Sequence, residues 1–317
     1  GDGRLAGLKS IYLANSIPFE ELDAAALSRR FPQFAVPEDW NALFQKDAGV
    51  LFATKCVLAL WERFQARGGD SLIGHRVLSI EPPDSGGRGR VTITMSNESQ
   101  YKAKHVVVAA GAWITPLAAS LGLNIPTRVS EETVSFYLPR DPATAPDHSF
   151  RSMPHFIPWV PNGLGPYGYY GLPEVDVPGV KASAHYCGPT VDPDRRPPEG
   201  MQHARVLQST ADLITTMFPH LDPTPASHHT CLYTSTPDHD FVLGAHPQHP
   251  TSVFFAGGGS GHAFKFGTAA GELMARLVLG ESPCESLELQ SGSGRGGRQA
   301  KEVMDSRETA SSRGREK

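Results

Sequence analysis

Hydrophobic positions recur with helical spacing in two early stretches of the chain. Residues 20–30 and 49–66 each place apolar side chains three to four positions apart, so each predicts a helix. Residues 32–48 predict a loop, and residues 114–122 predict a short helix. Apolar or alternating runs bounded by Gly, Pro, Ser and Asn predict strands at 8–14, 75–80, 90–95, 101–103 and 105–109.

The pattern changes at about residue 128. Strand-like runs at 134–138, 167–171 and 180–186 are separated by many prolines. One helix is expected among them, over residues 202–217. Short strands that are interrupted so often favour an antiparallel sheet.

These patterns predict two domains and an α/β fold class, α+β overall. Residues 48–127 and 234–285 are expected to form a layered βα domain. Residues 1–47 and 128–233 are expected to form the antiparallel-sheet domain. Residues 291–317 hold almost no apolar side chains, so we expect a disordered tail there.

A glycine-rich turn near the end of the chain combines several signals. An apolar run at 253–256 leads into Gly257, Gly258, Gly259 and Gly261, and a helix is expected over 262–279 with Lys265 in its first turn. Free N–H groups and the helix dipole, about +0.5 charge, make such a turn suitable for an anionic partner. Most such turns are only packing devices, however. No second strand follows the helix, so this is not the usual dinucleotide fingerprint.

The composition narrows the classes of function. A net charge of −4 over 317 residues is too small to imply a nucleic-acid partner. No apolar run approaches the length of a membrane span, and no leader opens the chain; Gly1 in place of Met favours a fragment or a processed product. Four cysteines without a CxxC spacing argue against a zinc cage or a disulfide scaffold and favour a reducing compartment.

Two other site types are disfavoured. The pair His228-His229 and the DHD at 238–240 lack a second cluster at metal-ligand spacing, so no metal is expected. Ser260 lies at a strand–helix turn, as a hydrolase nucleophile does. The required Gly-x-Ser-x-Gly is not met, because His262 stands in the place of the second glycine.

Several motifs together resemble the sarcosine oxidase family of flavoproteins, especially its peroxisomal sarcosine and L-pipecolate oxidases. The motifs are RFPQF, DAGVLFATKCVLAL, HVVVAAGAW, YYGLP, GVKASAHY, CLYTSTPDHDF and GGGSGHAFKFG. The resemblance covers about residues 10–285 and implies an FAD-binding domain, here 48–127 with 234–285, beside a substrate domain. It implies oxidation of a secondary amino acid, sarcosine or L-pipecolate, to the imine, with O2 reduced to H2O2. A monomer without nucleic-acid or membrane partners is expected.

The resemblance assigns catalytic roles to Lys181, His185, Tyr170, Tyr233 and Lys265. Lys181 matches a lysine near which oxygen is activated, and His185 matches a histidine near the substrate amine. Lys265 matches the lysine that binds the substrate carboxylate, and the tyrosines match substrate-pocket residues. On a strand, Lys181 and His185 would face one side. A core histidine at 185, packing at Tyr233 and a solvated lysine at 265 are the alternatives.

The resemblance also implies FAD bound covalently through Cys231. A thiolate is the nucleophile that such a bond needs; a small buried hydrophobic residue is the alternative role. The other residues that match the flavin site are Gly257, Gly258, Gly259, Ser260, Gly261, His262, Lys265, Ala110, Gly111, Trp113 and Val77. The turn before the last helix would stabilise negative charge on the pyrimidine side of the flavin.

The chain also departs from the family pattern. No GxGxxG occurs within residues 1–48, so the first βαβ unit and the pyrophosphate cradle are expected to be missing, as in an N-terminally truncated member. FAD binding would then be weak or absent, and the alternative function is a catalytically inactive isoform or fragment. Peroxisomal location follows from the resemblance, but the end, Arg315-Glu316-Lys317, lacks an SKL-type signal, which favours the cytoplasm.

Overall fold

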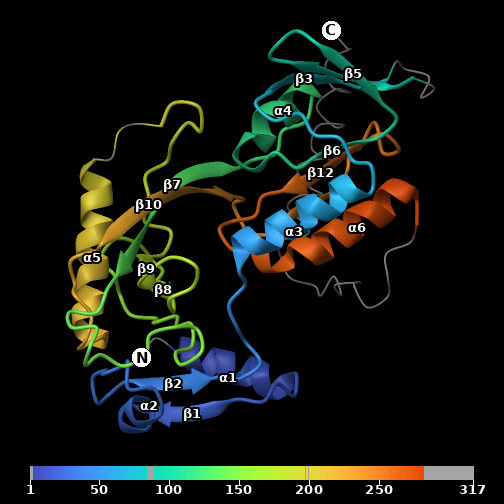
Figure 1. The fold of residues 1–317 in the computed structure, drawn as a ribbon. Coiled ribbons are helices and arrows are strands. Elements are labelled where there is room, and N and C mark those ends of the chain that lie inside the picture. Colours follow the sequence, from blue (N-terminus) through green and yellow to red (C-terminus); the bar gives the residue numbers. More distant parts are fainter. Residues whose placement is uncertain (1–2, 84–88, 197, 199, 282–317) are drawn as a thin grey trace, which may run out of the picture. The chain divides into compact units, whose positions relative to one another are not determined.

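A computed structural model describes residues 3–83, 89–196, 198 and 200–281 (Figure 1). The chain divides into two compact units. The first comprises Gly1–Leu72 and Arg128–Tyr233, and the second comprises Ile73–Thr127 and Thr234–Lys317. Residues 48–72 thus fall in the first unit, whereas the sequence grouped them with residues 73–127. The expected disordered tail, 291–317, lies outside the described residues.

The first unit is built around a four-stranded sheet with the strand order β10-β7-β9-β8. Strand β9 pairs antiparallel with both of its neighbours, so Lys181 lies opposite Phe136 on one side and Leu172 on the other. The strands are β7 (Arg128–Tyr137), β8 (Tyr169–Leu172), β9 (Val180–Ala184) and β10 (Ser227–Ser235). The antiparallel pairing that the proline-rich pattern predicts is confirmed.

Helix α5 (Met201–Met217) packs against β7 and β9. Its apolar residues Val206, Leu213, Ile214 and Met217 are spaced as one helical face and are each at most 5% exposed. They join Phe218, Tyr137 and Phe156 in the core of this unit. Burial of each such side chain contributes about 1.5–3 kcal/mol, so this face holds the helix on the sheet.

The helix expected over 20–30 is only partly correct. Strand β1 (Glu20–Asp23) comes first and pairs antiparallel with β2 (Asn41–Phe44), inside the stretch expected to be a loop. Helix α2 (Ala24–Arg30) then begins where the Asp23 side chain accepts a hydrogen bond of 2.7 Å from the Ala26 N–H. Aspartate is among the best residues at this capping position, which explains why the helix begins there.

The strand expected at 8–14 is wrong, because this segment is helix α1 (Arg4–Ala14). A helix satisfies its own backbone hydrogen bonds, whereas a strand at this position needs a neighbouring strand. The helix ends at Asn15, whose N–H donates to the carbonyl oxygen of Ile11. The expected helix over 49–66 is confirmed as α3 (Ala53–Ala66).

The second unit contains two three-stranded sheets. In one, β12 (Val253–Gly257) lies between β11 (Val242–Ala245), which is antiparallel to it, and β6 (Val106–Val108), which is parallel. The other is antiparallel and consists of β3 (Val77–Glu81), β4 (Val91–Met95) and β5 (Gln100–Ala103). Strand β11 has no counterpart among the predicted strands, whereas the other five lie within two residues of their predicted places.

Two helices cover the sheets of the second unit. Helix α4 (Ile114–Ser120) packs against β3, and helix α6 (Gly267–Leu279) packs against β11 and β12. The core includes Ile114, Ala118, Val253 and Phe255, each at most 2% exposed. Helix α6 ends at Gly280, whose φ of 72° is a left-handed conformation that glycine adopts readily.

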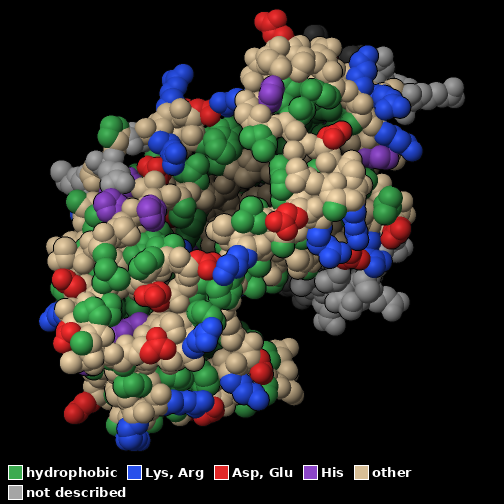
Figure 2. All heavy atoms as spheres, in the orientation of Figure 1, with side chains coloured by type: hydrophobic (Ala, Val, Ile, Leu, Met, Phe, Trp, Pro, Cys, Tyr) green, Lys and Arg blue, Asp and Glu red, His purple; other side chains and the backbone are tan. Residues whose placement is uncertain are grey.

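No helix within the described part of the chain is long and apolar enough to span a bilayer. Among the same residues, His, Cys, Asp and Glu form no group of three or more that is arranged to hold a metal ion. On the face that Figure 2 shows, acidic and basic side chains of the described residues are interspersed. The mixture agrees with the small net charge of the chain.

Candidate active site

A cluster of aromatic side chains surrounds His185 in the first unit. The hydroxyl oxygen of Tyr233 lies 3.3 Å from Nδ1 of His185. The rings of Tyr170 and Tyr233 meet the imidazole at 74° and 73°, with centroid distances of 5.3 and 5.6 Å. Edge-to-face contacts of this kind are favourable, so the imidazole is held in a defined orientation. Three residues that the sequence singled out therefore lie together.

The pairing of β8 with β9 explains how these residues meet. Tyr170 lies opposite Ser183, and side chains alternate along a strand, so Lys181, Ser183 and His185 share the side of Tyr170. The Lys181 Nζ is 5.9 Å from the centroid of the Tyr170 ring. The prediction that Lys181 and His185 face one side agrees with this geometry, although β9 itself ends at Ala184.

The electrostatics of the cluster favour uncharged groups. Burial raises the pKa of the Tyr170 and Tyr233 hydroxyls far above the usual range. Burial lowers the pKa of the Lys181 ammonium, and the nearby Cys231 opposes that shift. Desolvation penalises whichever form of a group carries the charge. It therefore raises the pKa of an acid such as tyrosine and lowers the pKa of a base such as lysine.

Cys231 lies in β10, two residues before Tyr233, and is exposed to solvent. Partial desolvation by the surrounding protein nevertheless raises the pKa of its thiol, and the positive charge of Lys181 lowers it. The alternative of a buried hydrophobic cysteine is therefore wrong for Cys231, while Cys187 is buried. The Cys231 thiol is therefore accessible to solvent, and the charge of Lys181 acts on its pKa.

Two tyrosines of the cluster were missed in the sequence. Tyr186 has a centroid distance of 4.1 Å to His185 and 5.3 Å to Tyr233, and Tyr167 stacks on Tyr186 at 4.6 Å. Tyr186 directly follows His185 in GVKASAHY, so that motif offered a signal. Tyr167 offered no such signal, because it lies in a loop whose path brings its ring beside Tyr186.

The glycine turn of the second unit is tightly packed. A Cβ on Gly257 would lie 2.4 Å from Cδ1 of Ile114, and one on Gly258 would lie 2.8 Å from Cγ2 of Thr236. Ser260 is fully buried and has a φ of 46°; its hydroxyl donates to the carbonyl oxygen of Gly258. The close approach at Gly257 and Gly258 is thus to protein atoms, as the packing interpretation predicts.

The helix after this turn begins later than expected. A 3₁₀ turn covers Phe264–Phe266, and α6 begins at Gly267. Lys265 therefore lies in the 3₁₀ turn, where it is exposed and has its Nζ 5.5 Å from the centroid of the Phe266 ring. His262 lies upstream, with Nε2 3.2 Å from the carbonyl oxygen of His239. The short 3₁₀ turn absorbs the change of direction that the glycines begin.

The remaining predicted flavin contacts also lie in the second unit. Strand β6 ends at Val108, and Gly111 then opens a 3₁₀ turn that ends at Trp113. Gly111 has a φ of 50° and open space where a Cβ would stand, so its main chain is accessible. Ala110 precedes this turn, and Val77 lies in β3 opposite Met95.

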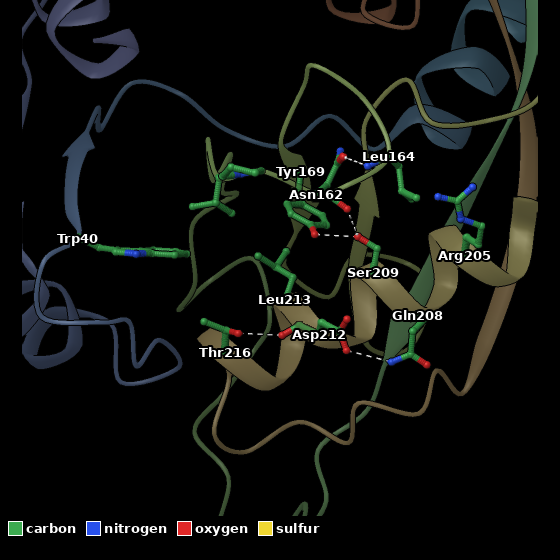
Figure 3. A pocket seen from close by; sticks show the side chains of 12 residues that line it. Trp40, Asn162, Leu164, Tyr169, Arg205, Gln208, Ser209, Asp212, Leu213 and Thr216 are labelled. Atoms are coloured by element: carbon green, nitrogen blue, oxygen red, sulfur yellow. Dashed lines mark hydrogen bonds between the residues drawn. The ribbon is translucent and has the colours of Figure 1, made fainter. Parts of the chain in front are cut away.

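A cavity of about 570 Å³ runs along α5 in the first unit (Figure 3). Its helix side carries Arg205, Gln208, Ser209, Asp212, Leu213 and Thr216, and facing residues include Trp40 and Leu164. The Ser209 hydroxyl donates to the carbonyl oxygen of Asn162 and accepts a 2.8 Å hydrogen bond from the hydroxyl of Tyr169. None of the site residues predicted from the sequence lines this cavity.

The sequence has relatives of known activity. Residues 2–277 match the family DAO, FAD dependent oxidoreductase. The chain is 32% identical over 266 residues to monomeric sarcosine oxidase of Bacillus sp. (strain B-0618). The aligned residues make up 84% of this chain and 65% of that protein. It is 29% identical over 267 residues to peroxisomal sarcosine oxidase of Homo sapiens, with the same shares covered. The chain thus spans just under two thirds of the length of these relatives.

Solved structures share the fold. NikD, an amino acid oxidase essential for nikkomycin biosynthesis, gives a TM-score of 0.72 at 24% identity and covers 88% of this chain and 70% of NikD. Glycine oxidase from Geobacillus kaustophilus gives 0.70 at 18% identity, covering 90% of this chain and 70% of that one. These likenesses agree with the mixed α/β fold with antiparallel sheets predicted from the sequence.

Proposed function

Because the chain belongs to the FAD dependent oxidoreductase family, we propose that it oxidises a secondary amino acid, sarcosine or L-pipecolate, to the imine with O2 as the electron acceptor. Hydrogen peroxide is the second product. The observation that carries the proposal is the contact of His185 with Tyr233 and Tyr170 beside Lys181. These four residues match the family motifs, and one sheet brings them together.

The donor groups present suit a flavin. In the first unit, the exposed thiol of Cys231 feels the charge of the half-buried Lys181. In the second unit, Gly111 leaves its main chain open to a ligand. Bound FAD would supply the acceptor for two electrons from the substrate and their transfer to oxygen. The tight packing at Gly257 and Gly258 supports a structural role for these two glycines, so the proposal relies on them least.

The Cys231 thiol is proposed to carry the covalent bond to FAD. Replacement of one flavin C–H and the thiol S–H by a carbon–sulfur bond releases two electrons and two protons, which O2 takes up as hydrogen peroxide. The reaction starts from the thiolate. Lys181 favours this form by its charge, against the desolvation that raises the thiol pKa.

His185 and Lys181 are proposed to hold and move protons. The Tyr233 hydroxyl orients the imidazole through its contact with Nδ1, and the imidazole is proposed to accept a proton from the substrate amine. The lowered pKa of Lys181 makes its ammonium a readier proton donor, and its charge stabilises negative charge that develops on oxygen. Tyr170 packs against both residues and holds the substrate-facing side of the imidazole.

Lys265 is proposed to bind the substrate carboxylate. Its ammonium is exposed in the second unit, and it lies beside Phe266. An exposed ammonium attracts a carboxylate through charge-assisted hydrogen bonds. Lys265→Met is expected to raise KM more than it lowers kcat.

The test begins with the 317-residue chain expressed in a host that makes FAD. We expect flavin absorbance to stay with the acid-denatured, washed pellet, and Cys231→Ser to release it into the supernatant. Peroxide formation is then measured with sarcosine and with L-pipecolate, using Lys181→Met as the control of similar shape. A colourless wild-type pellet together with no peroxide from either substrate would contradict the proposal for this chain.

A further inference from the structure

Glu132 lies in β7 and is 2% exposed, although none of the roles above uses it. A carboxylate loses its hydration when it is buried, so it is stable there only if donors replace the water. Both oxygens of Glu132 have such donors. Oε1 accepts a 2.6 Å hydrogen bond from the Ser130 hydroxyl. Oε2 accepts from the N–H groups of Cys187 at 3.0 Å and Gly188 at 2.9 Å.

The two N–H donors belong to the turn that follows β9, residues 185–188. Tyr186 in this turn has a φ of 57°, a left-handed conformation that is unfavourable for a residue with a Cβ. Gly188 packs so closely that a Cβ there would lie 2.0 Å from the carbonyl oxygen of Glu131. The turn is thus strained at Tyr186, and the Glu132 carboxylate holds it at Cys187 and Gly188.

This turn carries two rings of the candidate site. His185 and Tyr186 have a centroid distance of 4.1 Å, and Tyr186 lies 5.3 Å from Tyr233. Phe136 lies opposite Lys181 in the sheet, and side chains alternate along β7, so Glu132 is on the same side as Lys181. The carboxylate therefore supports the turn from the side of the sheet on which the rings stand.

The charge of Glu132 acts on the same groups. Burial is the main cause of the raised pKa at Tyr170, Tyr233 and Cys231, and the negative charge of Glu132 adds to it at each. Burial, Tyr167 and Glu132 together raise the pKa of Tyr186 to about 12. A fixed negative charge disfavours further anions nearby, so it keeps these hydroxyls as hydrogen-bond donors.

We propose that Glu132 is a positioning residue of the candidate active site, whose carboxylate holds the turn 185–188 so that His185 and Tyr186 pack against Tyr233. The consequence for catalysis rests on the proposed function, whereas the positioning itself does not. The neighbouring Glu131 offers a matched control. It is also buried, but its carboxylate binds Arg196 at 3.2 Å and lies 3.5 Å from Nε2 of His203, on the side of α5.

The experiment compares Glu132→Gln with Glu131→Gln in the full 317-residue chain, by two-dimensional NMR of the histidine ring C–H groups. A His185→Gln spectrum assigns the His185 signals. We expect Glu132→Gln to shift these signals, because the Tyr186 ring, whose centroid lies 4.1 Å from that of His185, moves with the turn. Glu131→Gln should leave them in place and shift those of His203. The readout needs neither flavin nor turnover, so it stands even if the oxidase proposal fails.

Unchanged His185 signals in folded Glu132→Gln would overturn the positioning role, as would an equal shift in Glu131→Gln. If Glu132→Gln does not fold, as judged by its thermal transition, Ser130→Ala replaces it. That variant removes the 2.6 Å donor to Oε1 and keeps the charge. A His185 shift in Ser130→Ala supports the proposal, and its absence overturns it. In an active chain, Glu132→Gln is further expected to lower kcat more than it raises KM.

Discussion

The Tyr233 hydroxyl oxygen lies 3.3 Å from Nδ1 of His185, although 48 residues separate the two in sequence. Tyr233 lies in β10 and His185 lies in the turn after β9, and β7 lies between these two strands in the sheet. The contact joins two motifs, CLYT and GVKASAHY, that the sequence offers separately. It fixes the orientation of the imidazole relative to the Tyr233 hydroxyl.

Removal of this hydroxyl by Tyr233→Phe is expected to lower kcat/KM for the proposed oxidation about tenfold, since loss of one hydrogen bond costs ~1 kcal/mol or more. Peroxide release measures the effect. Tyr169→Phe is the control, because it loses a 2.8 Å bond to Ser209 that faces the cavity along α5. It should cost similar stability and little activity. Equal losses of activity in both variants would argue against a specific role for Tyr233.

Lys181 is expected to make stability depend on pH. Burial lowers its pKa in the folded chain below the ordinary 10.5. Between the two values the unfolded chain binds more protons, so the free energy of unfolding rises with pH. Lys181→Met should remove this rise. The raised pKa of Cys231 acts in the opposite sense above the ordinary thiol value of 9.0, so the effect of Lys181 is taken as the difference in slope between the wild type and Lys181→Met.

Urea unfolding of the wild type and of Lys181→Met at several pH values up to 10.5 measures this slope. Lys55→Met is the matched control, because Lys55 is an exposed lysine of the same unit whose Nζ lies 2.9 Å from Asp176. It should keep the slope of the wild type. If Lys181→Met keeps that slope too, the ammonium is not desolvated in the folded chain.

Gly258→Ala is expected to destabilise the second unit by at least 1–2 kcal/mol, an order-of-magnitude value for a left-handed residue that gains a Cβ. Gly258 has a φ of 63°, and the added Cβ would lie 2.8 Å from Thr236 Cγ2. Gly111→Ala separates the cost of the left-handed backbone from the cost of the close contact, since Gly111 has a φ of 50° with open space where a Cβ would stand. Chemical denaturation should show the larger loss for Gly258→Ala. A larger loss for Gly111→Ala would contradict the packing at the turn.

Asp23→Ala is expected to lower the free energy of unfolding by ~1 kcal/mol, because the Ala26 N–H loses its 2.7 Å acceptor at the start of α2. Asp23→Asn keeps an acceptor at the same place and should stay within a few tenths of the wild-type value. Thermal and urea unfolding provide the comparison. Two variants of equal stability would mean that α2 does not depend on this cap.

Local patterns were sufficient where backbone geometry and side-chain alternation act over a few residues. Helices α3 and α5 and the strands of the second unit other than β11 lie within a few residues of their predicted places. Alternation along β9 placed Lys181 and His185 on one side. The prediction at 8–14 was wrong, because an apolar run of this length suits a strand or a helix until the availability of a neighbouring strand is known.

The sequence by itself determined the family, the mixed fold and which residues carry reactive groups, since motifs and periodicity are local properties of the chain. Only the tertiary structure decided which of these groups meet. The contact of Tyr233 with His185 and the bonds from Glu132 to the turn 185–188 each join segments about 50 residues apart. Tyr167 and Glu132 belong to no recognisable motif. The place of Glu132 comes from the pairing of strands and the burial that the pairing imposes, and that of Tyr167 comes from the path of a loop.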